Sequence, residues 1–164
     1  YNARFGDPET QTMMMLLAPD CDLAAILLAC CTETLDQVSV PVLPGFACNV
    51  VIAAGGYLDS YPRGDVITLA PCPKGKLLLI LPLVPLMLSL GVQIFHAGTE
   101  RDATGELKTA GGRVLSVAAY GSSLEEAVAL AYEGVKSVQF NGMFYRRDIA
   151  SRYEPLCPLE QRGR

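Results

Sequence analysis

The pattern that most constrains the fold is a strand-like run joined directly to an amphipathic helix, in residues 113–135. Residues 113–120 are mostly apolar, which is typical of a buried strand. Ser122 or Ser123 then precedes Glu125 and Glu126, which predicts a helix start with a capping box. The apolar residues that follow recur at helical spacing: Leu124, Ala127, Val128, Ala131 and Val135. Because a helix with one apolar stripe must pack on another surface, the sequence predicts an α+β domain in which this helix packs on a sheet.

Other short runs supply the remaining strands of this predicted sheet. Residues 47–54 are apolar and lie between Gly45 and Gly55, so they predict a buried strand. Further strands are predicted at 64–69, 92–95 and 138–140, and a hairpin-like turn is predicted within 101–108.

Before residue 45 the sequence predicts a helix and a connection. Asp20 or Asp22 can cap a helix over residues 23–31, and its apolar content predicts that this helix is mostly buried. Residues 32–44 then form a connection with one short extended piece at 38–40.

Charge and cysteine content limit the function classes. The net charge is −4 and no basic stripe is present, which argues against a nucleic-acid partner. Six cysteines form no C-x-x-C pair. Cys21, Cys30 and Cys48 lie among small apolar residues, which suits buried free thiols and therefore a reducing, cytoplasmic location.

Residues 76–90 form an apolar block that fits none of these elements. As a helix, residues 77–90 would rise about 21 Å against a hydrocarbon core of about 30 Å. Pro82 and Pro85 also disfavour that helix. We rank a retained in-frame intron or gene-model error first, a partner-binding or membrane-touching loop second, and a transmembrane span last.

The first eleven residues gather more convergent polar chemistry than any other stretch. Arg4 offers a planar fork of donors for a phosphate or carboxylate, and Asn2 offers an oxygen that Mg²⁺ accepts. Gly6 and Pro8 would present Asp7 and Glu9 on a stiff loop. An ordinary capped turn leading into a helix explains the same residues, because Asp, Pro and Glu also favour helix starts.

Several motifs in order resemble one enzyme family, glycinamide ribonucleotide synthetase, also called phosphoribosylamine-glycine ligase. They are Asn2-x-Arg4-Phe5-Gly6-Asp7-Pro8-Glu9, Gly55-Gly56-Tyr57, Gly64-Asp65-Val66-Ile67, Phe95-His96-Ala97-Gly98-Thr99, Gly111-Gly112-Arg113-Val114-Leu115 and Phe144-Tyr145-Arg146-Arg147-Asp148-Ile149. The likeness covers residues 1–152 apart from 76–90, and is strongest to fungal forms fused to a second purine enzyme. Leu58 and Asp59 depart from it by replacing the Pro and Gly of the family's turn.

The resemblance implies a division of the chain. Residues 1–44 would be the C-terminal end of an ATP-grasp domain and its connection. Residues 45–152 would be the family's C-terminal domain, a small antiparallel sheet with one packed amphipathic helix, and 153–164 a tail. Because family members begin well before Tyr1 and the chain lacks an initial Met, we expect a C-terminal piece of an enzyme.

The resemblance also implies a reaction, in which ATP drives the joining of glycine to 5-phosphoribosylamine through a glycyl phosphate in de novo purine (IMP) biosynthesis. Asn2 would be one ligand of Mg²⁺ or Mn²⁺, and its companion Glu would precede Tyr1. Arg4 would contact the transferred phosphoryl group or acyl phosphate, while Asp7 and Glu9 would shape the substrate pocket. The loops around His96 and Gly111-Gly112 would lie near the cleft. His96 itself suits either a general acid or base or a structural role.

Two expectations concern the whole molecule. This chain alone would be inactive, since it holds one metal ligand and no adenine pocket, and a longer protein could be fused to aminoimidazole ribonucleotide synthetase. The alternative is a non-catalytic α+β accessory domain with a partner-binding or membrane-touching apolar loop.

Overall fold

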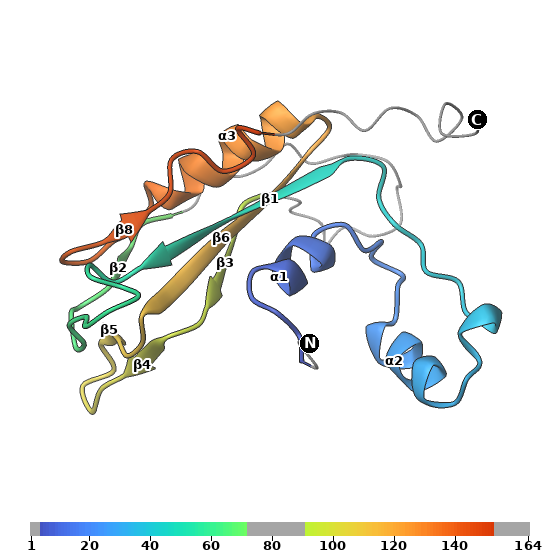
Figure 1. Cartoon of the computed structure of the whole chain (residues 1–164), viewed down its shortest axis with the longest axis horizontal. Coiled ribbons are helices and arrows are strands. Elements are labelled where there is room, and N and C mark those ends of the chain that lie inside the picture. Colours follow the sequence, from blue (N-terminus) through green and yellow to red (C-terminus); the bar gives the residue numbers. More distant parts are fainter. Residues whose placement is uncertain (1–3, 72–90, 153–164) are drawn as a thin grey trace.

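A four-stranded sheet with the strand order β3-β6-β1-β8 forms the centre of the molecule in the computed structural model, which describes residues 4–71 and 91–152 (Figure 1). Its strands are β1 (Phe46–Ala53), β3 (Gln93–His96), β6 (Arg113–Gly121) and β8 (Phe144–Tyr145). All of its pairings are antiparallel. The predicted fold class, α+β with a small antiparallel sheet, is confirmed.

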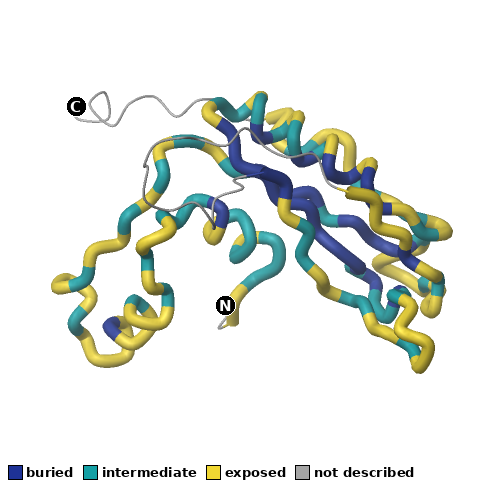
Figure 2. The backbone as a smooth tube through the Cα atoms, turned by 180° about the vertical axis from the view of Figure 1, so that it is seen from behind, coloured by how far each residue is buried: buried dark blue, intermediate teal, exposed yellow. Residues whose placement is uncertain are grey.

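The two long central strands, β1 and β6, pair along nearly their whole length. Phe46 lies opposite Gly121 at one end, and Ile52 lies opposite Leu115 near the other. Most of their residues are buried on both faces of the sheet, as Figure 2 shows by the dark blue of the central strands. Such two-sided burial is why both strands read as near-continuous apolar runs.

One face of the sheet is covered by α3 (Leu124–Val135), the predicted amphipathic helix (Figure 1). Ser123 is its N-cap and accepts a hydrogen bond from the amide of Glu126, whose carboxylate accepts one from the amide of Ser122. The helix packs on the sheet through Ala127, Ala131 and Val135, which are all buried. The sequence therefore predicted this layer correctly.

The other face is partly covered by α1 (Glu9–Met14) and the residues after it. Met15 packs there against Ala118 and Tyr120 of β6. Because side chains alternate along a strand, this face carries Asn49 of β1 and Ser116 of β6, whereas Val50 and Val117 face α3.

Two small ribbons complete the domain. β4 (Thr99–Arg101) pairs with β5 (Leu107–Thr109), and β2 (Thr68–Leu69) pairs with β7 (Val138–Gln139). The predicted hairpin is thus confirmed. The strand predicted over 64–69 is shorter than expected, because only its last two residues form β2 and Val66 makes an isolated bridge to Lys108.

The segment before β1 corrects one prediction. α2 (Leu23–Cys31) begins at the cap Asp22 as predicted, but Ala29 is its only buried residue, so the prediction of a mostly buried helix was wrong. The helix lies apart from the four-stranded sheet (Figure 1), and its other residues are half-buried or exposed. The piece predicted to be extended at 38–40 follows η1 (Leu35–Gln37), a short 3-10 helix, and begins at Val38 with an extended backbone, although it forms no named strand.

The described cysteines are all free thiols, at positions 21, 30, 31 and 48. Cys48 is buried in the core and this burial raises the pKa of its thiol, but Cys30 is exposed, contrary to the prediction. The apolar block at 76–90 and the tail at 153–164 lie outside the described residues. Within 4–71 and 91–152, no helix is long and apolar enough to cross a membrane.

The fold predicts a sharp contrast between two aliphatic side chains. Ile52 is completely buried in β1, whereas Leu58 is 82% exposed. We expect Ile52→Ala to lower the free energy of unfolding by about 2–5 kcal/mol, through lost burial and the cavity left behind. Urea unfolding followed by circular dichroism measures this. Leu58→Ala is the matched control and should leave the midpoint nearly unchanged, so equal effects of the two variants would contradict the described core.

Candidate functional site

The N-terminal segment that carries the candidate site residues is bound to the sheet by two side chains from different strands. Arg113 at the start of β6 donates from Nη1 to the backbone carbonyl of Asp7 at 2.6 Å. Asn49 in β1 donates from Nδ2 to the carbonyl of Pro8 at 3.2 Å. Two consecutive carbonyls of the segment are therefore held by the face of the sheet opposite α3.

The predicted site residues differ in their surroundings. The carboxylate of Asp7 accepts a hydrogen bond from Gln11 Nε2 at 2.8 Å, and its Oδ2 lies 3.7 Å from Arg113 Nη1. Arg4 and Glu9 are exposed. Asn2, the predicted metal ligand, lies outside the described residues. The structure thus joins Asp7 to Arg113 and leaves the side chains of Arg4 and Glu9 at the surface.

The helix start that offered an alternative explanation of this segment is present. α1 begins at Glu9, with Pro8 in the N-cap position, and no side chain supplies a cap hydrogen bond. Glu9 lies in the first turn, where a negative charge is favourable. The helix is therefore real, but Asp7 points its carboxylate to Gln11 and Arg113 rather than to the helix amides.

Glycines bring the loops beside Arg113 into backbone contact. The amides of Ala110 and Gly111 both donate to the carbonyl of Gly98, and the amide of Gly98 donates to the carbonyl of Arg113 at 2.8 Å. A Cβ on Gly98 would lie only 2.6 Å from that carbonyl oxygen. The two loops therefore lie against each other through a close approach that only glycine allows. Their place near a cleft stays a prediction.

In α1 and on the face of the sheet that it covers, three polar side chains each have a buried oxygen without a hydrogen-bond partner among the described residues. These oxygens are Gln11 Oε1, Asn49 Oδ1 and Ser116 Oγ. Asn49 and Ser116 lie on adjacent strands and on the same face of the sheet. This face is therefore polar at its centre, in contrast to the apolar face under α3.

His96 does not join this cluster. It is exposed at the end of β3, and its Nδ1 lies 3.0 Å from Thr99 Oγ1. Residues 4–71 and 91–152 also contain no group of three or more His, Cys, Asp or Glu that could hold a metal ion. A role for His96 as general acid or base stays a prediction.

Arg113 is the residue that sequence reasoning did not assign. It belongs to a motif quoted for the family resemblance, but its contact with Asp7 spans 106 positions in the sequence. No local pattern signals so distant a contact. Only the three-dimensional structure brings the two residues together.

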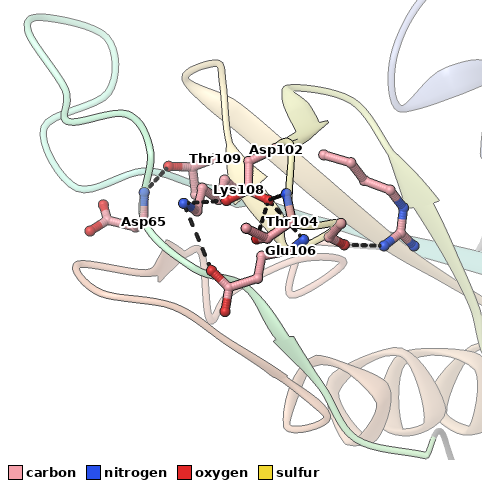
Figure 3. Close-up of polar contacts among 8 residues, drawn as sticks. Asp65, Asp102, Thr104, Glu106, Lys108 and Thr109 are labelled. Atoms are coloured by element: carbon pink, nitrogen blue, oxygen red, sulfur yellow. Dashed lines mark hydrogen bonds and ion pairs between the residues drawn. The ribbon is translucent and has the colours of Figure 1, made fainter.

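Among the described residues, the carboxylate with the most strongly shifted pKa lies elsewhere, in the β4–β5 hairpin. Lys108, 2.6 Å from Asp102 Oδ2, lowers the pKa of Asp102 well below its usual range, and hydrogen bonds from Thr104 and the Glu106 amide add to this effect. Figure 3 shows these partners converging on Asp102. Because every partner belongs to the same hairpin, the perturbed pKa reports a stabilised turn rather than a reactive group.

Together these features define a small α+β domain whose sheet packs a helix on one face and binds a preceding segment of chain on the other. Residues 47–152 match the family model described as phosphoribosylglycinamide synthetase, C domain. The chain belongs to this family.

Individual relatives agree with the family match. The chain is 49% identical over 151 residues to the bifunctional purine biosynthetic protein ADE1 of Schizosaccharomyces pombe, covering 92% of this chain and 17% of that protein. It is 44% identical over 153 residues to the phosphoribosylamine–glycine ligase of Synechocystis, covering 93% of this chain and 32% of that protein.

A solved structure gives the same result. The phosphoribosylamine–glycine ligase of Thermotoga maritima superposes with a TM-score of 0.63 at 37% identity, over 92% of this chain and 32% of that one. The chain therefore spans about a third or less of the length of these relatives.

The Asp102 cluster gives a pH prediction. Folding lowers the pKa of Asp102 from 3.8. The charged carboxylate therefore contributes to stability above about pH 4, and this contribution is lost as the pH falls through the lowered pKa of the folded state. We expect Asp102→Asn to destabilise the protein at neutral pH, and the difference from the unsubstituted chain to shrink in strong acid. Unfolding by urea across a pH series measures both.

Asp59→Asn, at an exposed aspartate of another turn, is the control and should change stability little at any pH. A difference for Asp102→Asn that stayed constant down to about pH 2 would contradict the assigned charge effect.

Proposed function

We propose that this chain is the C-terminal part of an ATP-dependent ligase that joins glycine to 5-phosphoribosylamine, giving glycinamide ribonucleotide, ADP and phosphate in purine biosynthesis. The observation that carries the proposal is the family match over 47–152, together with identities of 44–49% to named purine enzymes. The match extends beyond the domain to the N-terminal segment, since these alignments cover 92–93% of the chain.

We further propose a boundary near Gly45, with 1–44 as the end of an ATP-grasp domain and 45–152 as the C-terminal domain. Two observations support this division. The family model begins at residue 47. α2 consists of apolar residues, yet Ala29 is its one buried residue and Leu28 is exposed, and such an exposed apolar surface is expected of a helix that packs against other parts of a larger domain.

In this proposal the glycine carboxylate attacks the γ-phosphate of ATP, and ADP leaves. The amine of phosphoribosylamine then attacks the acyl carbon of the glycyl phosphate, and phosphate leaves. The exposed guanidinium of Arg4 would contact the transferred phosphoryl group, because its planar donors match phosphate oxygens. Glu9 and Asp7 would shape the substrate pocket, Glu9 from the surface and Asp7 from its position against Arg113.

Mg²⁺ or Mn²⁺ is the cofactor that the family resemblance implies, with Asn2 as one ligand. The described residues do not form a metal site by themselves. Held in part by Asn2, such a metal would offset the negative charge that develops on the transferred phosphoryl group.

Partners and location follow the same proposal. The Schizosaccharomyces pombe relative is named as a bifunctional protein, so the longer protein proposed here could also be fused to aminoimidazole ribonucleotide synthetase. The free thiols of the described residues suit a cytoplasmic enzyme.

The first test uses the purified chain. We expect no glycine-dependent release of ADP from it, because the proposal places the nucleotide-binding strands in the part of the ligase that this chain does not cover. A fusion of this chain to the part of the Synechocystis relative that it does not cover, about two thirds of that protein, should release ADP when glycine and phosphoribosylamine are present. We call this fusion the restored ligase. A restored ligase that folds but lacks activity would overturn the proposed function.

The second test examines Arg4 in the restored ligase. If its guanidinium stabilises the developing phosphoryl charge, Arg4→Ala should lower kcat by about 10²-fold, with partial recovery in Arg4→Lys. Steady-state ADP release measures this. Arg101, an exposed arginine of the β4–β5 hairpin that donates to the carbonyl of Gly105, is the matched control. Equal losses in Arg4→Ala and Arg101→Ala would refute the role of Arg4.

A further inference from the structure

We propose that Arg113 and Asn49 are positioning residues that fix the Arg4–Glu9 segment to the C-terminal sheet. The proposal rests on the proposed function, because that function places substrate-contacting groups on this segment. The sheet would then determine where Arg4 and Glu9 stand relative to the substrates, although neither Arg113 nor Asn49 needs to touch a substrate.

Arg113 and Asn49 hold the segment by its backbone. They bind the carbonyls of Asp7 and Pro8, at 2.6 and 3.2 Å. Backbone carbonyls move only with the chain itself, so holding two in a row fixes the path of the segment as well as one side chain. Arg113 also lies 3.7 Å from the carboxylate of Asp7, which adds a charge interaction to the hydrogen bond.

A bulge at the start of β6 makes Arg113 face the segment. Ile52 lies opposite Leu115, but the next residue, Ala53, lies opposite Arg113. Val114 therefore has no partner in this register and is the extra residue of the bulge. Val114 and Leu115 are both buried in the core under α3. If β6 continued as a regular strand through Val114, Arg113 would lie two residues before Leu115, on the same face, and would point toward α3. The bulge turns it to the face that carries α1, and re-aiming a side chain is a known use of bulges.

The backbone of Arg113 is itself fixed. Its carbonyl accepts from the amide of Gly98, and the carbonyl of Gly112 accepts from the amide of Ala54 at 2.8 Å. A Cβ on Gly98 would come within 2.6 Å of the Arg113 carbonyl oxygen, and a Cβ on Gly112 would meet the ring of Tyr57. The guanidinium therefore extends from a rigid base.

Asn49 provides the second fixed point. Its relative exposure is 8%, and burying an amide inside an apolar strand is costly unless it makes hydrogen bonds. Its Nδ2 bonds to Pro8, and its Oδ1 has no partner among the described residues. A polar residue kept at such a position is explained by the contact that it makes with the segment.

The test measures hydrogen exchange in the 164-residue chain, comparing amides of α1 with amides of the centre of β6. Arg113→Met should speed exchange in α1 by about tenfold or more, while exchange in β6 stays unchanged. Arg113→Lys should restore part of the protection, because an ammonium can still donate to one carbonyl. Asn49→Asp, which keeps the shape but replaces the donor with an acceptor, should also speed exchange in α1.

Arg101→Met is the matched control, since Arg101 also donates to a backbone carbonyl, within its own hairpin. It should leave α1 unchanged. Unaltered exchange of α1 in Arg113→Met, or an equal rise in α1 and β6, would overturn the proposal. The second result would mean that Arg113 serves only general stability.

Kinetic measurements on the restored ligase show whether Arg113 positions the segment for catalysis or only attaches it to the sheet. Arg113→Met should lower kcat and leave the KM for ATP unchanged, whereas Arg101→Met should change neither. Faster exchange in α1 without any loss of kcat would overturn the positioning role. The unsubstituted restored ligase is measured alongside, so failure of the proposed function itself is seen there and not mistaken for failure of the positioning residues.

Discussion

The pairing of β1 with β6 is the interaction on which the rest of the structure depends. Most residues of both strands are buried, so their backbone groups must find hydrogen-bond partners within the sheet, and the ladder from Phe46–Gly121 to Ile52–Leu115 supplies many of them. The register of this ladder decides which side chains face α3 and which face the N-terminal segment. Since a slip of one residue exchanges the two faces, the register cannot shift without exposing the core.

One such exchange of faces is present, and it is confined to the start of β6, at the end of its ladder with β1. The bulge at Val114 keeps that residue in the core and turns Arg113 to the opposite face. A charged side chain thus gains its orientation from the packing of its apolar neighbour. The contact between Arg113 and Asp7 therefore depends on the register of the sheet. It holds the segment that carries the proposed site residues.

The sequence predicted the parts of the fold that local patterns determine. The stripe of α3, its Ser123 cap and the two apolar central strands were all visible in residue order. The predicted burial of α2 was wrong. Its residue types favour a helix, but whether a helix is buried depends on which other elements pack over it. The role of Arg113 could not be predicted, since it needs both a bulge and a contact across 106 positions.

The charges around the N-terminal segment suit the binding of an anionic phosphoryl group, as the proposed chemistry requires. A phosphoryl group near the segment would be repelled by a bare carboxylate at Asp7, because like charges at short range are unfavourable. Arg113 and Gln11 engage that carboxylate, so part of its charge is offset within the protein. Glu9 lies farther along, in the first turn of α1, whereas Arg4 on the other side of Asp7 is a cation at the surface. An anion that approaches the segment from the Arg4 side would therefore meet a cation before it meets the carboxylates, and opposite charges attract.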